Sequence, residues 1–232
     1  MELHFLGIGS AYNTAWYNSN AYFYQGNSLF LLDCGESAFA RLMEKNMLCK
    51  SLEAVYVLVT HLHADHAGSL PSLCSYMAGH MGKRAQIVYP GNEIDTYLQL
   101  AGIPPENYEH RYYDRLSLPS MHARAVPSEH ISGYPSFGWL LEDESGECYF
   151  SGDAKRIPAM VLEKLLEGKM QMVYHDVEWN HEKKEDACHL QYQTLLALIP
   201  IEARKHFCCM HLNCDFRDRA TKDGFLVAQM DI

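Results

Sequence analysis

The segment His61-Leu62-His63-Ala64-Asp65-His66 gathers four metal-binding side chains within six residues. Imidazole and carboxylate groups are suitable ligands for Zn²⁺, and also for Mn²⁺ or Fe. One tetrahedral ion cannot readily use all four groups and still keep a position open for water. The cluster therefore predicts a site with two metal ions, and metal-assisted hydrolysis as its chemistry.

The order of residues in the cluster indicates how two ions would be shared. His61 and His63 are alternate residues of an extended segment, so they share a face and can reach one ion. Asp65 and His66 follow after the chain turns, and they can reach a second ion. Both ions need further ligands, and the sequence offers three at loop positions that follow predicted strands: His130, Asp153 and His211.

The cluster follows directly on the run of residues 54–59, which is continuous, apolar and rich in β-branched residues. This pattern predicts a buried strand that delivers the cluster at its end. Alternation and turn signals predict further strands at Leu3–Gly7, Asn20–Tyr24, Ser28–Asp33, Gln86–Tyr89, Met121–Val126, Ser136–Leu141, Cys148–Ser151, Met170–His175 and His206–His211. Helical spacing is expected over Glu36–Met47, Leu70–His80, Ile94–Ala101, Ala159–Leu166 and His189–Ile199.

This order of elements favours an α/β (α+β) fold in which two sheets pack together with helices outside them, a four-layer αββα sandwich. No repeat, low-complexity run or linker interrupts the 232 residues, so one domain over residues 1–232 is expected.

The charge balance bears on possible partners. The formal net charge is −10, and no cluster of four or more Lys and Arg residues occurs. Binding a polyanion draws on positive charge that faces the phosphates, so a long nucleic acid is not the expected partner.

The location of the protein follows from its apolar runs and cysteines. No run approaches the roughly 18–20 apolar residues that span a bilayer, so no membrane is expected as a partner. The start of the chain lacks the basic and apolar regions of a signal peptide. The eight cysteines form no CxxC pair and read as reduced thiols. We expect a cytoplasmic protein.

The metal-type residues resemble the signature of the metallo-β-lactamase superfamily. Gly9-Ser10-Ala11 and Asp33-Cys34-Gly35 look like its early GSA and DCG elements, and Ser151-Gly152-Asp153 falls in the family's order. By that resemblance one metal is held by His61, His63 and His130, the other by Asp65, His66 and His211, and Asp153 bridges the two. The expected cofactor is two Zn²⁺ ions, with Mn²⁺ or Fe as alternatives.

Within the superfamily the chain is most similar to the RNase Z branch. The segment 130–139 resembles that branch's run from a ligand histidine into a strand. His189 falls where RNase Z carries a catalytic histidine, and His175-Asp176 resembles its His-Glu pair. Asp176 stands in place of the glutamate that would orient His189.

Two departures separate the chain from RNase Z itself. Only 22 residues lie between His130 and Asp153, where bacterial RNase Z inserts a long arm that grips tRNA. Leu190-Gln191 follows His189 instead of Ser-Thr. The opening segment 5–13 and the missing arm resemble the compact anti-Pycsar proteins, which open cyclic mononucleotides, more than the PhnP-like enzymes, which act on cyclic ribose phosphates.

The resemblance implies a phosphodiesterase for a small nucleotide-like phosphodiester, foremost a cyclic mononucleotide. Metal-bound hydroxide would attack phosphorus, His189 would protonate the departing ribose oxygen, and Asp176 would hold the ring of His189. The residues expected to take part in catalysis are Asp65, His189 and Asp176. The alternative without a role in catalysis is that His189 is a solvated or capping residue in the first turn of a helix.

Other functions remain open from the sequence. An RNase Z-type tRNA 3′-processing endonuclease is the first alternative, and a thioester, lactone or β-lactam hydrolase of the same fold is the second. A binding module that has kept the fold would have lost ligands, whereas here all seven are present.

Three further expectations concern the surroundings of the site. The loop from Tyr12 to Asn18 is rich in aromatic residues and either stacks on a base or packs as a subunit contact. A homodimer is expected, with the helix after the cluster at the contact through Leu70, Leu73, Tyr76 and Met77. The remaining histidines are expected to be structural or solvated: His4, His80, His110, His122, His181 and His206.

Overall fold

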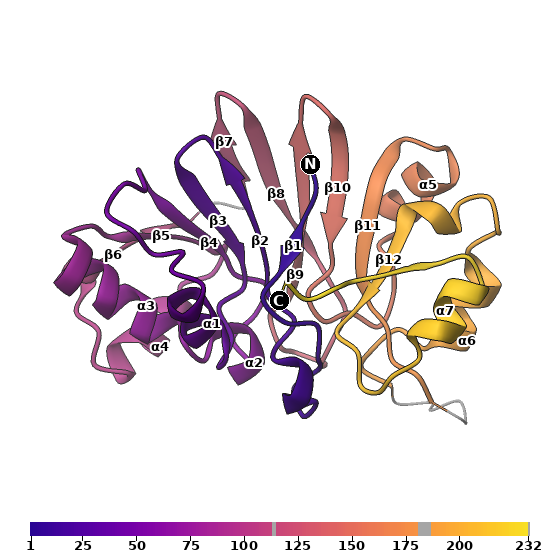
Figure 1. The fold of residues 1–232 in the computed structure, drawn as a ribbon, viewed down its shortest axis with the longest axis horizontal. Helices are drawn as coiled ribbons and strands as arrows, with labels where there is room; N and C mark the ends of the chain where they lie inside the picture. The colour runs from indigo at the N-terminus through magenta and orange to yellow at the C-terminus, as the bar shows by residue number, and fades with distance from the viewer. Residues whose placement is uncertain (113–114, 181–186, 232) are drawn as a thin grey trace.

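Two β-sheets pack against each other, and helices lie outside them (Figure 1). The computed structural model describes residues 1–112, 115–180 and 187–231, so His181 lies outside the described residues. The strand order is β1-β2-β3-β4-β5-β6 in one sheet and β13-β12-β11-β10-β9-β8-β7 in the other. The expected four-layer αββα sandwich is confirmed.

The first sheet is formed by the first half of the chain. Its strands are β1 (His4–Phe5), β2 (Ala21–Gln25), β3 (Ser28–Leu32), β4 (Val55–Leu58), β5 (Ala85–Val88) and β6 (Tyr108–Arg111). β2 and β3, both predicted as strands, form a hairpin in which Gln25 pairs with Ser28 across a two-residue turn. Gly26 has a φ of 55° in that turn, a backbone conformation that favours glycine.

The second sheet is formed by the second half. Its strands are β7 (Arg115–Leu118), β8 (Met121–Pro127), β9 (Phe137–Asp143), β10 (Gly146–Phe150), β11 (Met170–Asp176), β12 (Phe207–Met210) and β13 (Leu226–Val227). β7 to β10 are antiparallel, and β10 to β13 are parallel.

The helices connect the parallel strands. They are α1 (Ala38–Glu44), α2 (Ala64–Ala67), α3 (Leu70–Tyr76), α4 (Glu93–Leu100), α5 (Ala159–Leu166), α6 (Tyr192–Leu198) and α7 (Arg217–Lys222). Shorter helical turns are η1 (Thr14–Trp16), η2 (Met77–Met81), η3 (Pro105–Asn107) and η4 (Arg204–His206). Within the described residues, no helix combines the length and the apolar character needed to cross a bilayer.

Two apolar cores hold these layers together. Between the sheets, Phe23 and Phe30 stack with ring centroids 4.9 Å apart, and Trp139 is fully buried in the same cluster. On the other face of the first sheet, Leu42 and Leu73 pack with the buried strand residues. Burial of apolar surface is the main favourable contribution to folding, so both sheets form a fixed base for the loops at the strand ends.

The helix predicted from His189 onward begins instead at Tyr192. Glu178 donates its backbone N–H to Leu190 O at 2.8 Å and accepts that of Tyr192 at 3.0 Å. This short parallel bridge keeps residues 189–191 extended. The expectation of a helix at His189 is therefore wrong, and this histidine lies in the segment that precedes α6.

The predicted strands were found, but β6, β7 and β13 were not predicted. β6 has the sequence Tyr-Glu-His-Arg, which lacks an apolar strand pattern, and it becomes a strand by pairing with β5. The helix predicted over Leu70–His80 has two parts. α3 ends at Tyr76, and the π turn η2 follows it. Leu70, Leu73 and Met77 are fully buried inside the chain, so only Tyr76 of the expected dimer contact stays partly exposed.

Candidate metal centre and active site

The seven predicted ligands come together because the loops that carry them lie at neighbouring strand ends. The loop after β4 and the short helix α2 carry the HxHxDH cluster. His130 follows β8, Asp153 follows β10, and His211 follows β12. All seven side chains fall into two overlapping groups whose ligand atoms lie within 4.8 Å of one another.

The first ligand group contains three histidines and one carboxylate. His63 Nδ1 lies 3.0 Å from His61 Nε2 and 3.4 Å from His130 Nε2. Asp153 Oδ2 lies 3.8 Å from His61 Nε2 and 3.7 Å from His130 Nε2. Ligands around a tetrahedral Zn²⁺ lie about 3.4 Å apart, so this spacing fits one metal ion.

The second ligand group is more compact. His66 Nε2 and His211 Nε2 lie 3.3 Å and 3.2 Å from Asp65 Oδ2. The same two nitrogens lie 3.0 Å and 3.3 Å from Asp153 Oδ1. Asp153 therefore faces each group with a different oxygen. His66 Nε2 and Asp153 Oδ1 are buried without a hydrogen-bond partner. A bound metal ion would satisfy both atoms, so the residues fit a pair of ions.

Asp33 fixes the ring of His66 from behind. His66 Nδ1 donates to Asp33 Oδ2 at 2.7 Å, which leaves Nε2 for the metal side. Thr60 donates its backbone N–H and its hydroxyl to the same carboxylate at 2.7 Å and 2.8 Å. Carboxylates that hold a ligand histidine in this way set its tautomer and orientation. The sequence reasoning did not assign this role to Asp33, although the DCG element contains it.

The first group is also oriented by its surroundings. His130 Nδ1 donates to the carbonyl oxygen of Cys188 at 3.0 Å. The ring of Tyr134 stacks on His63 with centroids 4.8 Å apart and planes inclined by 16°. Neither Tyr134 nor Cys188 was singled out from the sequence. The position of Tyr134, four residues after a ligand histidine, is the one sequence signal by which it could have been found.

Gly35 lets the ligand loop approach closely. A Cβ at this position would lie 1.8 Å from the backbone oxygen of Asp65, a distance that no side chain tolerates. The backbone N–H of Gly35 donates to Asn20 Oδ1 at 2.9 Å, which holds the loop in this position. Glycine is therefore required here, and the DCG element contributes both the carboxylate behind His66 and the space for Asp65.

Asp176 contacts two histidines at once. His189 Nδ1 donates to Asp176 Oδ2 at 2.5 Å, and His211 Nδ1 lies 3.3 Å from Asp176 Oδ1. The rings of His189 and His211 stack with centroids 5.2 Å apart. His189 Nδ1 lies 4.0 Å from Asp153 Oδ2, so the imidazole borders both ligand groups. This places a proton-carrying group beside the metal centre.

The charges of the centre depend strongly on one another. Burial lowers the pKa of His211, but Asp153 and Asp176 outweigh it and raise that pKa to about 10. Burial also opposes the charge of His66, whose pKa is nevertheless raised well above its usual value by Asp153 and the neighbouring carboxylates. Burial would raise the pKa of Asp153, but the histidines around it hold that pKa well below its usual value. The buried carboxylates of the site therefore favour the binding of positive charge.

The centre opens into a pocket of about 380 Å³. His63, Asp65, Asp153 and His189 line its floor, and Tyr12 and Ile131 line its rim. Tyr12 is 97% exposed, whereas Tyr17 of the same loop is 37% exposed and Trp16 is partly buried. Arg217 lies over the ring of Trp16, and Arg41 over that of Tyr17. Of these three rings, only that of Tyr12 faces the pocket.

Comparisons with known proteins agree with this geometry. The family model of the Anti-Pycsar protein Apyc1 matches residues 1–99 and 91–230. The Anti-Pycsar protein Apyc1 of Paenibacillus sp. (strain J14) is 25% identical over 231 residues, which cover 93% of this chain and 90% of that protein.

Solved structures share the fold. The metallo-β-lactamase fold protein YhfI of Bacillus subtilis superposes with a TM-score of 0.77 at 14% identity, covering 99% of this chain and 97% of that one. The short form of human tRNase Z superposes with a TM-score of 0.73 at 17% identity, covering 100% and 98%. These likenesses confirm the expected fold. Because the family model spans nearly the whole sequence, the protein belongs to the Anti-Pycsar Apyc1 family.

Proposed function

We propose that the protein is a metal-dependent phosphodiesterase that opens the cyclic ester of a cyclic mononucleotide. The observation that carries this proposal is the position of Asp153, whose two oxygens face two ligand groups, beside the imidazole of His189. The membership in the Anti-Pycsar family supports the phosphodiester class. A pocket of about 380 Å³ has room for a ligand as small as one nucleotide.

The cofactor we propose is a pair of Zn²⁺ ions, with Mn²⁺ or Fe as alternatives. The first ion would be held by His61, His63 and His130, and the second by Asp65, His66 and His211, with Asp153 shared. When bound, such ions supply an activated water and neutralise charge that develops on phosphate oxygens. Five of the seven ligands are imidazoles, a composition that suits Zn²⁺ better than Mg²⁺ or Ca²⁺.

The protein's own contribution is the transfer of a proton. Water adds to phosphorus, the bond from phosphorus to the ribose oxygen breaks, and the departing oxygen needs a proton. His189 uses Nδ1 to bind Asp176, so its Nε2 is the atom that would donate to the leaving oxygen. The carboxylates of Asp65 and Asp153 carry negative charge and would bind the metal ions. The product is a phosphate monoester.

The base of the nucleotide would bind at the rim of the pocket. Tyr12 stands on a turn in which Asn13 N donates to Ser10 O at 3.0 Å. That turn is joined to the residue after His211, because Ser10 N and Asn13 Nδ2 donate to Leu212 O at 3.1 Å and 2.9 Å. The backbone that carries Tyr12 is thus fixed relative to the metal centre. We infer that the ring of Tyr12 stacks on the base, opposite Ile131.

The tRNA endonuclease remains the second candidate because of the likeness to tRNase Z. Against it, β9 and β10 form a plain hairpin in which Asp143 pairs with Gly146 across Glu144 and Ser145. No inserted arm follows His130. The acidic net charge of −10 also opposes the binding of a long nucleic acid.

Three broader features are part of the proposal. We propose that residues 1–232 form a single domain, that the protein acts in the cytoplasm, and that it works as a homodimer. The partly exposed Tyr76, which packs with Phe39 and His80, supports a contact on the face of α1 and α3. Analytical ultracentrifugation of the wild type beside Tyr76→Glu tests the dimer.

The test of the function is a panel of substrates offered to the metal-loaded protein and to its His66→Ala variant. The panel contains 3′,5′-cyclic nucleotides, bis(p-nitrophenyl) phosphate, a 3′-extended tRNA precursor and a thioester. We expect turnover of cyclic nucleotides by the wild type and none by the variant. Cleavage of tRNA or of the thioester without turnover of any cyclic nucleotide would overturn the proposal.

A further inference from the structure

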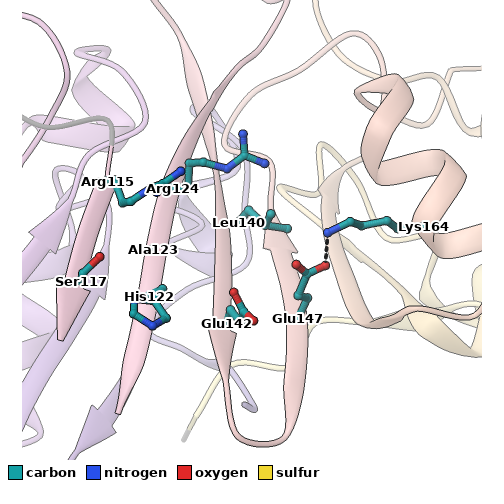
Figure 2. Close-up of a pocket in the computed structure, with 9 residues that line it drawn as sticks. All are labelled: Arg115, Ser117, His122, Ala123, Arg124, Leu140, Glu142, Glu147 and Lys164. Carbon is teal, nitrogen blue, oxygen red and sulfur yellow. Dashed lines mark hydrogen bonds and ion pairs between the residues drawn. The ribbon is translucent and has the colours of Figure 1, made fainter. Parts of the chain in front are cut away.

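The outer face of the second sheet carries another cavity, of about 340 Å³, that contains no residue of the metal centre (Figure 2). It lies over β7, β8, β9 and β10, with Lys164 of α5 on one side. In Figure 1 the helices α5, α6 and α7 lie beside β11 and β12. Ser117, His122 and Glu142 are exposed over the remaining strands. This part of the sheet is therefore open to a ligand.

Two arginines lie directly opposite each other in this cavity. Arg115 of β7 pairs with Arg124 of β8 in the antiparallel register, and both line the cavity. Side chains paired in this way have Cβ atoms about 4.5–5.5 Å apart, and like charges at that position destabilise the strand pair. Figure 2 shows both side chains extended along the same end of the cavity. The arrangement concentrates positive charge at one place.

Neither guanidinium has a carboxylate partner within the described part of the chain. Arg124 Nη2 donates to Met160 Sδ at 3.5 Å, and a thioether is a weak acceptor. The nearby Glu147 is engaged by Lys164. The chain contains 29 acidic and 19 basic residues, so carboxylates are plentiful elsewhere. The two arginines thus keep strong donors available for an anion from outside.

The rest of the cavity indicates the kind of anion. Leu140 is buried, lies beside Arg124 in the register and supplies the apolar floor of the cavity. Ser117 and His122 offer hydrogen-bonding groups in the neighbouring row. Guanidinium groups bind phosphate oxygens in a two-pronged manner, and an adjacent pair suits a dianion. A cavity of this size holds a small organic ligand.

We propose that this cavity binds a small phosphate monoester of the size of a nucleoside monophosphate. The phosphate lies between Arg115 and Arg124, and the body of the ligand rests on Leu140. The site is separate from the metal centre, and the inference stands whether or not the proposed function is correct.

The test is a calorimetric titration of the metal-loaded full chain with AMP, with inorganic phosphate and with adenosine. The variant is Arg115→Gln/Arg124→Gln, and the matched control is Arg84→Gln, which changes an exposed arginine just before β5 of the other sheet. We expect the wild type and the control to bind one more AMP per chain than the double variant. The His66→Ala variant should keep this extra AMP site, which would show that the site is distinct from the metal centre.

Affinity and salt dependence add independent readouts. We expect the single variant Arg115→Gln, which changes an exposed side chain, to weaken AMP at this site roughly tenfold, because it removes charge-assisted hydrogen bonds. Inorganic phosphate should compete with AMP, added NaCl should weaken both, and adenosine should not bind. An unchanged number and affinity of AMP sites in both variants, or adenosine bound as tightly as AMP, would overturn the inference.

Discussion

His189 donates a hydrogen bond of 2.5 Å from Nδ1 to Oδ2 of Asp176, and the other oxygen of that carboxylate lies 3.3 Å from Nδ1 of His211. Asp176 is fully buried. One carboxylate thus orients both a proposed metal ligand and the proposed proton donor. Because Asp176 is outside the seven proposed ligands and its two oxygens face the two imidazoles, we propose it as a positioning residue whose effect on activity passes through them.

Replacement of Asp176 by Asn keeps the size of the side chain but removes its charge. We expect kcat for a cyclic nucleotide to fall roughly 10- to 100-fold at saturating metal. Steady-state kinetics with a parallel measurement of bound metal separate loss of positioning from loss of metal. Asp223→Asn, which alters a surface carboxylate bound by Tyr192 and Arg219, should leave kcat unchanged. A normal kcat in Asp176→Asn would remove the positioning role.

Replacement of His189 by Ala tests the proton transfer directly. We expect kcat for a cyclic nucleotide to fall by about 10²–10⁴, the usual contribution of general acid catalysis. Hydrolysis of bis(p-nitrophenyl) phosphate should change little, because p-nitrophenolate leaves without a proton. Comparison of the two substrates in the same preparation makes the measurement. Equal losses on both substrates would instead assign His189 to substrate binding.

Replacement of Asp33 by Asn should weaken metal binding, because the amide no longer holds the Nδ1–H of His66 as a carboxylate does. We expect metal affinity to fall roughly 10- to 100-fold, with activity recovered in excess metal. Competition with a chromogenic chelator measures the affinity. The matched control is Asp95→Asn, which alters another Asp–His pair, that with His110. If Asp33→Asn and Asp95→Asn bind metal equally well, Asp33 does not orient the ligand.

Metal affinity should increase with pH. The pKa of His211 is raised to about 10 in the metal-free chain, and that of His66 is also raised, so both imidazoles carry protons at neutral pH. Metal binding must expel these protons, and each released proton raises the affinity about 100-fold between pH 6 and pH 8. Calorimetry in buffers of different ionisation enthalpy counts the protons. A pH-independent affinity with no proton release would contradict this charge state.

Replacement of Tyr12 by Ala should weaken the binding of the nucleotide substrate. We expect KM for a cyclic nucleotide to rise about tenfold, with kcat nearly unchanged, because stacking of a base on an aromatic ring is lost. Tyr12→Phe should keep the wild-type KM, since the ring remains. Tyr24→Ala, which removes an exposed tyrosine of β2, serves as the control. An unchanged KM in Tyr12→Ala would show that the base binds elsewhere.

The sequence by itself was sufficient for the features that local pattern records. His61, His63, Asp65 and His66 lie within six residues, so their chemistry is legible without a fold. The buried strand before them and most other strands follow from apolar runs and turn residues. The fold class follows from the order of these elements, and the resemblance to a known superfamily supplied the distribution of ligands between two ions.

Tertiary structure alone decided the relationships between distant segments. Asp33 reaches His66 across 33 residues, and His130 is held by the carbonyl of Cys188 across 58. His189 leaves the predicted helix because its neighbours pair with Glu178. The opposed pair of Arg115 and Arg124 exists only through the register of β7, a strand that was not predicted. Periodicity in a sequence reports which face of an element is buried, whereas these contacts depend on which elements become neighbours, and packing of the whole chain determines that.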